Sequence, residues 1–268
     1  MNRPRDALLG RIIALANDDA RVTSLLLSGS LGRGDGDDWS DIDLIAVVAP
    51  EDHKGFVAGA REWLAPAAPL VLWSQPFAGA PLFNAVAEDW LRYDLTIVIP
   101  GHAPTARDRC RALIDRGGVW AALPETLPPR AADPARVAAM VQEFIRILAL
   151  LPLGLGREEF AVGVTGVGLL RTQLISLLIE ALDLPQPPGA LHLSRLLPAE
   201  DMALLKGLPP VAATGASVLA SSRALAEAFL PRARRLMARV GAPWPEALWT
   251  AAQAHLHRNL GTDWPPLD

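Results

Sequence analysis

Two aspartates, Asp41 and Asp43, stand two residues apart at the head of an apolar run. Side chains alternate between the two faces of a strand, so the sequence predicts that both carboxylates lie on one face, while Ile42 and Leu44 lie on the other. Two adjacent carboxylates repel each other and need a counter-charge, which a divalent cation carrying phosphate oxygens commonly supplies. The pair therefore predicts a site for a metal ion and phosphate.

A second polar motif, Gly29-Ser30, follows the apolar run 25–27. A strand that ends in Gly-Ser and leads into a helix leaves backbone N–H groups free at the helix start, and these groups bind phosphate together with the helix dipole. Gly29 allows the chain to approach a phosphate closely. Ser30 is expected either to cap the helix or to donate its hydroxyl to a phosphate oxygen. One strand–helix–strand unit is thus predicted to hold a phosphate cradle and a carboxylate pair.

The ordered combination of Gly-Ser at residue 29, Arg-Gly at residue 33 and Asp-x-Asp at residue 41 resembles the signature of the nucleotidyltransferase superfamily. The signature covers only residues 25–99. A Gly/Asp-rich surface loop followed by an edge strand with capping aspartates is the alternative. The family places a third carboxylate on a later strand, and Asp94 matches that slot, with a solvent-facing strand residue as the alternative. The resemblance implies a catalytic metal site formed by Asp41, Asp43 and Asp94. It also implies a nucleotide-binding site formed by Gly29, Ser30, Arg33 and Ser40.

The layout, a minimal nucleotidyltransferase domain followed by a helical domain of similar size, resembles the aminoglycoside and lincosamide adenylyltransferases, which are antibiotic nucleotidyltransferases. This resemblance implies Mg²⁺-dependent transfer of a nucleoside monophosphate to a hydroxyl of a small molecule, with release of pyrophosphate. The co-substrate is expected to be ATP, with another NTP as the alternative. Some relatives form dimers with composite sites, so a homodimer is compatible with the resemblance.

A glutamate of the helical domain is the general base in some relatives. Glu143, Glu158 and Glu159 compete for that role here. Glu158 and Glu159 are expected either to contact a cationic substrate or to complement the dipole of the helix that they begin. Asp94 is the other candidate base.

Three other functions remain open at this point. The first is a protein-modifying or antitoxin-like nucleotidyltransferase, whose acceptor would be a tyrosine or serine of a partner protein. A non-catalytic nucleotide-binding module would bind nucleotide without turnover. An RNA-tailing enzyme is disfavoured because such enzymes need a basic surface.

Composition narrows the class of protein. The chain has 268 residues, 51% of them hydrophobic, and a net charge of −4. These values predict a globular protein without a nucleic-acid surface, and they favour a cationic or neutral small substrate. Cys110 is the one cysteine, which excludes an intrachain disulfide and a zinc site made of cysteines alone. No apolar signal region is seen at the N-terminus, and the apolar window 160–179 is expected to be a buried helix rather than a membrane span. A cytoplasmic protein is expected.

The chain order predicts an α/β (α+β) domain with a mixed sheet over residues 1–123. Helices are expected at 5–17, 51–65 and 105–117, and strands at 22–27, 41–48, 70–73, 82–88 and 91–99. A short helix is expected to begin at Ser30.

The segment 124–134 carries four prolines and is expected to be an extended, fairly stiff linker. The rest predicts an all-α helical bundle over residues 134–268. Helices are expected at 134–151, 157–182, 194–206, 210–240 (with a break near Pro231 as one option) and 243–260. Gly163, Gly166 and Gly168 weaken the second helix by about 1 kcal/mol each relative to alanine. Close helix packing is the favoured explanation for these glycines, and space for a ligand is the alternative.

Overall fold

The computed structural model describes residues 3–77, 81–185, 193–261 and 264. The chain forms two compact units, Met1–Leu127 and Pro128–Asp268. The division falls inside the proline-rich segment 124–134. Each unit has its own hydrophobic core.

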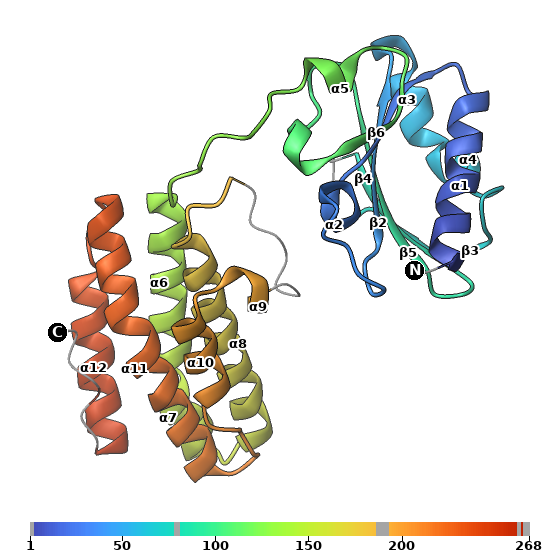
Figure 1. The fold of residues 1–268 in the computed structure, drawn as a ribbon. Coiled ribbons are helices and arrows are strands. Elements are labelled where there is room, and N and C mark those ends of the chain that lie inside the picture. Colours follow the sequence, from blue (N-terminus) through green and yellow to red (C-terminus); the bar gives the residue numbers. More distant parts are fainter. Residues whose placement is uncertain (1–2, 78–80, 186–192, 262–263, 265–268) are drawn as a thin grey trace. The chain divides into compact units, whose positions relative to one another are not determined.

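The first unit is built on one six-stranded sheet with the strand order β3-β4-β5-β2-β1-β6 (Figure 1). The strands are β1 Val22–Leu27, β2 Ile42–Val48, β3 Leu70–Ser74, β4 Leu82–Ala87, β5 Arg92–Val98 and β6 Arg111–Asp115. β2 and β5 pair in parallel, and every other neighbouring pair is antiparallel. The predicted mixed sheet and α+β class are confirmed.

The two faces of this sheet are covered unequally. The helices of the unit are α1 Arg3–Asp18, α2 Gly29–Arg33, α3 Pro50–Ala58, α4 Ala60–Leu64 and α5 Val119–Ala122. Leu8 of α1 and Phe56 of α3 belong to a large buried cluster that also takes Ile42 and Leu44 from β2. The alternate β2 residues face a smaller cluster, to which Ile45 contributes. Because side chains alternate, Asp43 lies on this thinly covered face.

The helix predicted over 105–117 is wrong. A short 3-10 turn, η1 Arg107–Arg109, leads there into β6, which pairs with β1 at the edge of the sheet. The Asp115 carboxylate at the end of β6 accepts hydrogen bonds from Ser24 Oγ (2.8 Å) and from the backbone N–H of Val119 (2.7 Å). An edge strand is half solvated and therefore carries charges, so its local pattern resembles that of a surface helix. Pairing with the free edge of β1 makes residues 111–115 a strand, and the sequence of 105–117 alone does not indicate that pairing.

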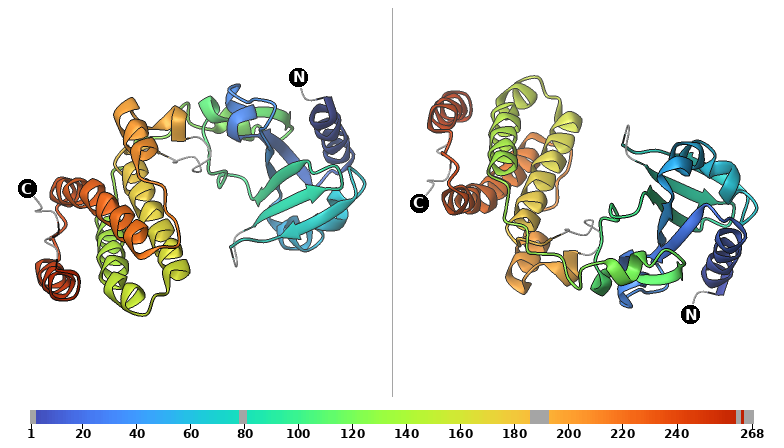
Figure 2. Two further views of the ribbon diagram at one scale, coloured as in Figure 1. Left: turned by 90° about the horizontal axis from the view of Figure 1, so that it is seen from below. Right: turned by 90° about the horizontal axis from the view of Figure 1, so that it is seen from above.

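The second unit consists of helices in the part of it that the structure describes (Figures 1 and 2). They are α6 Pro134–Ala149, α7 Leu151–Gly156, α8 Phe160–Glu180, α9 Leu193–Leu196, α10 Ala199–Gly207, α11 Gly215–Val240 and α12 Glu246–Leu260. The helix α6 packs against α8, α11 and α12. Phe144 of α6 and Phe229 of α11 stack in the core with ring centroids 3.8 Å apart.

Two helices of this unit differ from their predicted ranges, and the structure decides between the two options left for 210–240. The helix expected over 157–182 begins only at Phe160, after the separate short helix α7. The helix expected over 194–206 is divided at Pro198, which is the N-cap of α10. The helix α11 continues through Pro231 without a break, since Phe229 and Leu230 before it and Ala233 after it are all buried in the core. Packing therefore outweighs the lost backbone hydrogen bond.

Two helical stretches, Pro134–Gly156 and Phe160–Glu180, are long and apolar enough to cross a membrane by length and composition alone. The core helices of soluble proteins pass the same test. The expectation of a buried helix over 160–179 is met only in part. Leu170 and Leu174 are buried, but Val162 and Leu169 remain 63% and 49% exposed.

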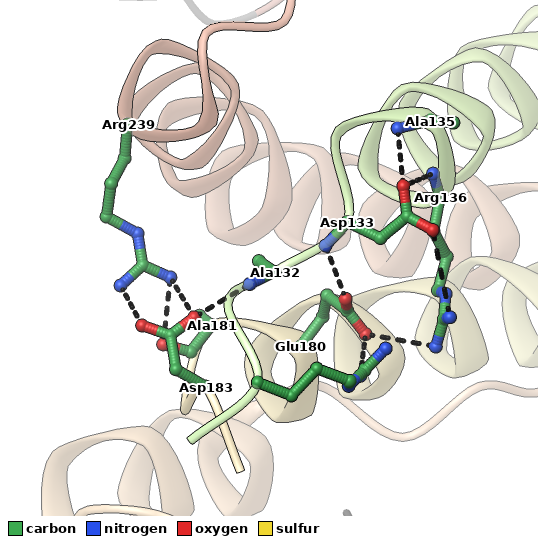
Figure 3. Close-up of polar contacts among 9 residues, drawn as sticks. Ala132, Asp133, Ala135, Arg136, Glu180, Ala181, Asp183 and Arg239 are labelled. Atoms are coloured by element: carbon green, nitrogen blue, oxygen red, sulfur yellow. Dashed lines mark hydrogen bonds and ion pairs between the residues drawn. The ribbon is translucent and has the colours of Figure 1, made fainter. Parts of the chain in front are cut away.

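A buried carboxylate fixes the start of the second unit (Figure 3). Glu180, at the end of α8, is 4% exposed and accepts a hydrogen bond from the backbone N–H of Asp133 (2.9 Å). Its other oxygen accepts a hydrogen bond from Arg130 (3.1 Å) and forms an ion pair with Arg136 (3.5 Å). The Asp133 carboxylate caps α6, as predicted, by accepting from two backbone N–H groups. The end of the linker is thus tied to the end of α8.

A neighbouring carboxylate ties down the preceding linker residue (Figure 3). Asp183 accepts a hydrogen bond from the backbone N–H of Ala132 (3.0 Å) and another from Arg239 of α11 (2.8 Å). Arg239 also donates to the carbonyl oxygen of Ala181 (3.0 Å). Arg130, Ala132 and Asp133 are therefore held by two carboxylates at and just after the end of α8, and Arg239 of α11 in turn holds Asp183.

Replacing Glu180 by glutamine should destabilise the second unit by about 1.5–3 kcal/mol, the usual loss when hydrogen bonds to a charged group are weakened. Urea unfolding of the full chain measures this loss. Glu227→Gln is the matched control, because Glu227 is 54% exposed and forms an i,i+4 pair with Arg223. The control should change the unfolding free energy by no more than about 0.5 kcal/mol. Equal effects of the two changes would contradict the role given to Glu180.

Candidate functional site

The loop after β1 passes directly beside the carboxylate of Asp43. The backbone N–H of Ser28 donates to the carbonyl oxygen of Asp43 (2.8 Å), which holds the start of α2 against β2. Gly29 has φ +60°, and a Cβ atom built on it would lie 1.7 Å from Asp43 Oδ2. A residue with a side chain would be strained in this backbone conformation and would force the Asp43 carboxylate or the turn to move, so glycine is favoured there. The two predicted motifs therefore meet at Gly29 and Asp43.

The predicted carboxylates come from two neighbouring strands. Asp43 of β2 and Asp94 of β5 are direct partners in the parallel register, so both side chains project from the same face of the sheet. Asp41 immediately precedes β2, and its carboxylate lies 3.7 Å from an Arg92 guanidinium nitrogen. Asn84 of β4 donates a hydrogen bond of 2.7 Å to Asp94 Oδ1. Asp94 is therefore held in a defined orientation beside Asp43.

The electrostatics of the cluster are those of crowded carboxylates. The pKa of Asp43 is raised to about 6, chiefly by burial and further by repulsion from Asp41 and Asp94, while Arg33 and Arg92 act in the opposite direction. Burial also raises the pKa of Asp94; the hydrogen bond from Asn84 lowers it, and Asp41 raises it further. Such raised pKa values mean that the negative charge is poorly compensated by the protein alone. A bound cation would relieve the repulsion.

The fit of a metal ion can be tested on these residues. In the described part of the chain, no group of three or more His, Cys, Asp and Glu side chains is arranged to hold a metal ion. Mg²⁺, however, is usually bound through one or two carboxylates, with substrate phosphates and water completing its octahedron. Asp43, whose ionised form is disfavoured by burial and by two neighbouring carboxylates, offers that kind of oxygen ligand. These carboxylates therefore fit a Mg²⁺ ion that binds together with a phosphate. They do not enclose a metal ion by themselves.

Asp43 should make the folded protein less stable as the pH rises from about 4 to about 6. Its pKa is about 6 in the folded protein, against an ordinary value of 3.8 in an unfolded chain. Between these values the folded state binds more protons, so the free energy of unfolding falls as the pH rises and the loss is complete above the folded pKa. Urea unfolding of the wild type and Asp43→Asn across this window isolates the contribution. A stability difference that does not change with pH would contradict the assignment.

The residues between the two motifs form a hydrogen-bonded loop. Ser30 Oγ donates to Ser40 Oγ (2.9 Å), and Ser40 Oγ donates to Asp37 Oδ1 (3.2 Å). The Arg5 guanidinium donates to the carbonyl oxygens of Asp37 (2.6 Å) and Ser40 (3.1 Å). Arg33, at the end of α2, forms an ion pair with Asp35 (3.2 Å). This network fixes the path of the chain into Asp41.

The expected capping role of Ser30 is wrong, because the N-cap of α2 is Ser28. Ser30 lies inside the first turn and is buried. Its hydroxyl instead connects α2 to Ser40. The nucleotide-binding roles of Ser30, Ser40 and Arg33 stay predictions.

Three positioning residues, Arg5, Asn84 and Arg92, were missed by the sequence reasoning. The position of Arg92 in the sequence could have indicated its role, since it stands two residues before Asp94 on the same strand face. Asn84 is a polar residue within an apolar strand, which is a weaker indication of such a role. Arg5 is far away in sequence, and only the packing of α1 brings it to the loop.

Tryptophans near the site have different environments. Trp73 stacks on Phe83 with ring centroids 4.7 Å apart and is part of the packing. Trp39, which directly precedes Ser40, and Trp90, at the β4–β5 turn, are 88% and 75% exposed. The carbonyl oxygen of Trp39 lies 3.5 Å from an Arg92 guanidinium nitrogen. Trp39 and Trp90 therefore present exposed rings, whereas one face of the Trp73 ring is covered by Phe83.

The three candidate glutamates belong to the second unit. Glu143 accepts two hydrogen bonds of 2.7 Å from Arg146, which lower its pKa and make it a weak base. Glu158 has φ +56° and lies in the turn between α7 and α8. Glu159 immediately precedes α8 and lines an apolar cavity. A role as base or in substrate binding stays a prediction for Glu158 and Glu159.

No protein-family model matches the chain, and no curated protein matches its sequence. Among solved structures, the chain is similar to an aminoglycoside 6-adenyltransferase from Bacillus subtilis, with 12% sequence identity and a TM-score of 0.43. The alignment covers 95% of this chain and 98% of that chain. Likeness at this level is distant, so the residues of the site alone carry the functional assignment.

Proposed function

We propose that the protein is a nucleotidyltransferase that transfers a nucleoside monophosphate from an NTP, ATP in the first instance, to a hydroxyl of a small molecule. The observation that supports this most strongly is the contact between the two motifs. Gly29, at the start of α2, leaves no room for a Cβ beside the Asp43 carboxylate, and Asp94 is the register partner of Asp43. Backbone that can bind phosphate and carboxylates that can bind a cation are thus adjacent.

In this proposal the backbone N–H groups at the start of α2 and the Ser30 hydroxyl hold the β- and γ-phosphates. Arg33 offsets phosphate charge. One or two of the carboxylates of Asp41, Asp43 and Asp94 would hold Mg²⁺, which when bound lowers the pKa of the acceptor hydroxyl and offsets the charge of the entering and leaving oxygens. The cluster is suited to this because its charge is poorly compensated by the protein alone.

The acceptor oxygen forms a bond to the α-phosphorus, and the bond from that phosphorus to the pyrophosphate oxygen breaks. The proton of the acceptor hydroxyl goes to a base, and pyrophosphate leaves with the bonding electrons. Asp94 is the favoured base within the first unit, since its raised pKa increases its basicity and Asn84 orients it. Glu158 and Glu159 are the alternatives from the second unit.

The acceptor class is proposed from charge and layout. A net charge of −4 favours a cationic or neutral small molecule over nucleic acid. The layout, a catalytic unit followed by a helical unit, favours an aminoglycoside or lincosamide antibiotic, and a role in antibiotic resistance would follow from that acceptor. The protein is proposed to act in the cytoplasm, without a membrane or nucleic-acid partner and with a homodimer as the candidate assembly.

Pyrophosphate release tests this function. The full chain is incubated with Mg²⁺ and each NTP against a panel of aminoglycosides, lincosamides and a protein mixture. Release that requires one small acceptor and is lost in Asp43→Asn supports the proposal and identifies the substrate. Release only with a protein acceptor would replace it by a protein-modifying reaction, and nucleotide binding without any release would replace it by a binding role.

A further inference from the structure

The second unit contains an apolar cavity of about 200 Å³ between α6, α7, α8 and α11. Leu148, Leu151, Val167 and Leu170 line its buried side. The polar groups on its wall are few, and the guanidinium of one of them, Arg146, is bound to Glu143. A cavity this apolar gives water few hydrogen-bond partners, so it favours an apolar ligand.

Two glycines keep this cavity open. A Cβ atom added to Gly154 of α7 or Gly166 of α8 would meet no heavy atom within 4 Å, although both residues line the cavity. Close packing explains only Gly163, whose added Cβ would lie 2.9 Å from Val218. Close packing, the favoured explanation of the three glycines, is therefore wrong for Gly166 and for Gly168, of which only Gly166 lines the cavity. A glycine within a helix costs about 1 kcal/mol relative to alanine, and here no neighbouring atom requires it.

We infer that this cavity is a binding site for a compact apolar group of a small molecule, such as an aromatic ring or a branched aliphatic chain. An engineered cavity of about 150 Å³ with a similar lining stays dry and binds benzene. The cavity described here is larger, at about 200 Å³, and has a rim that includes the exposed side chains of Val162 and Leu169. The site lies wholly within the second unit and does not depend on the proposed transfer reaction.

Fluorobenzene is a suitable probe, titrated into the full chain and followed by fluorine NMR. Gly166→Leu fills the cavity from α8, and Gly154→Leu fills it independently from α7. Gly168→Leu is the matched control, because Gly168 is on α8, has no heavy atom within 4 Å of an added Cβ and does not line the cavity. Circular dichroism confirms that each variant is folded.

Saturable binding of one fluorobenzene to the wild type and to Gly168→Leu is expected, with binding lost in Gly166→Leu and in Gly154→Leu. If only one of the two filling variants folds, fluorobenzene binding to that variant alone tests the inference. Absence of saturable binding to the wild type, or unchanged binding to a folded filling variant, would overturn the inference. Self-association that excludes fluorobenzene and disappears in Gly166→Leu would assign the cavity to a second copy of the chain and would also overturn it.

Discussion

Asp43→Asn is expected to reduce nucleotidyl transfer by about 10²–10³-fold, the scale of losing one preorganised electrostatic group at an active site. The substitution keeps the size of the side chain but removes the charge that would hold the cation and its phosphates. Asp43 is also the carboxylate in contact with the phosphate-binding turn at Gly29. The measurement is kcat and KM for pyrophosphate release, once an acceptor is known.

The same variant should remain folded. The free energy of unfolding of Asp43→Asn minus that of the wild type should be larger above pH 6 than at pH 4, because the raised pKa of Asp43 shows that its charge is unfavourable in the folded state. Asp89→Asn is the matched control, since Asp89 is exposed at the β4–β5 turn of the same unit. An Asp43→Asn enzyme that turns over like this control would contradict the site assignment. An unfolded variant would contradict the electrostatic account.

Gly29→Ala is expected to abolish activity and to destabilise the first unit. The added Cβ would lie 1.7 Å from Asp43 Oδ2, so the carboxylate or the turn must move. The backbone at φ +60° adds about 1–2 kcal/mol of strain for a residue with a side chain. Urea unfolding and pyrophosphate release measure the two effects.

Gly34→Ala separates the strain from the clash. Gly34 has φ +83° at the C-cap of α2, but its added Cβ would meet nothing within 4 Å. This variant should lose stability through backbone strain and keep most of its activity. Comparable activity in the two alanine variants would mean that the contact between Gly29 and Asp43 has no functional importance.

The strands of the first unit were largely predictable from local patterns. The run 22–27 becomes β1 with the same bounds, and the run predicted over 41–48 becomes β2, which Asp41 directly precedes and in which Asp43 is the second residue. The segment 105–117 was not predictable, because its conformation depends on the edge of β1 and not on its own residues. In the second unit, burial around Pro231 outweighed its local preference in the same way.

The candidate site was predictable as a set of residues but not as a geometry. The motif placed Gly29, Asp43 and Asp94 in one site, yet their contact depends on the parallel register of β2 and β5 and on the turn after β1. The positioning roles of Asn84 and Arg5 arise from pairs distant in sequence. The cavity beside Gly166 depends on four helices, so the sequence could offer it only as an alternative to close packing.

The central claim is that the cluster of Gly29, Asp41, Asp43 and Asp94 transfers a nucleoside monophosphate. The most direct measurement uses an NTP that is radiolabelled at the α-phosphorus, together with Mg²⁺ and the acceptor found by pyrophosphate release. The account predicts that the label appears covalently bound to the acceptor and that this product is absent with Asp43→Asn. Label that stays in the nucleotide while the γ-phosphate is released would contradict the account, because it would indicate NTP hydrolysis or phosphoryl transfer.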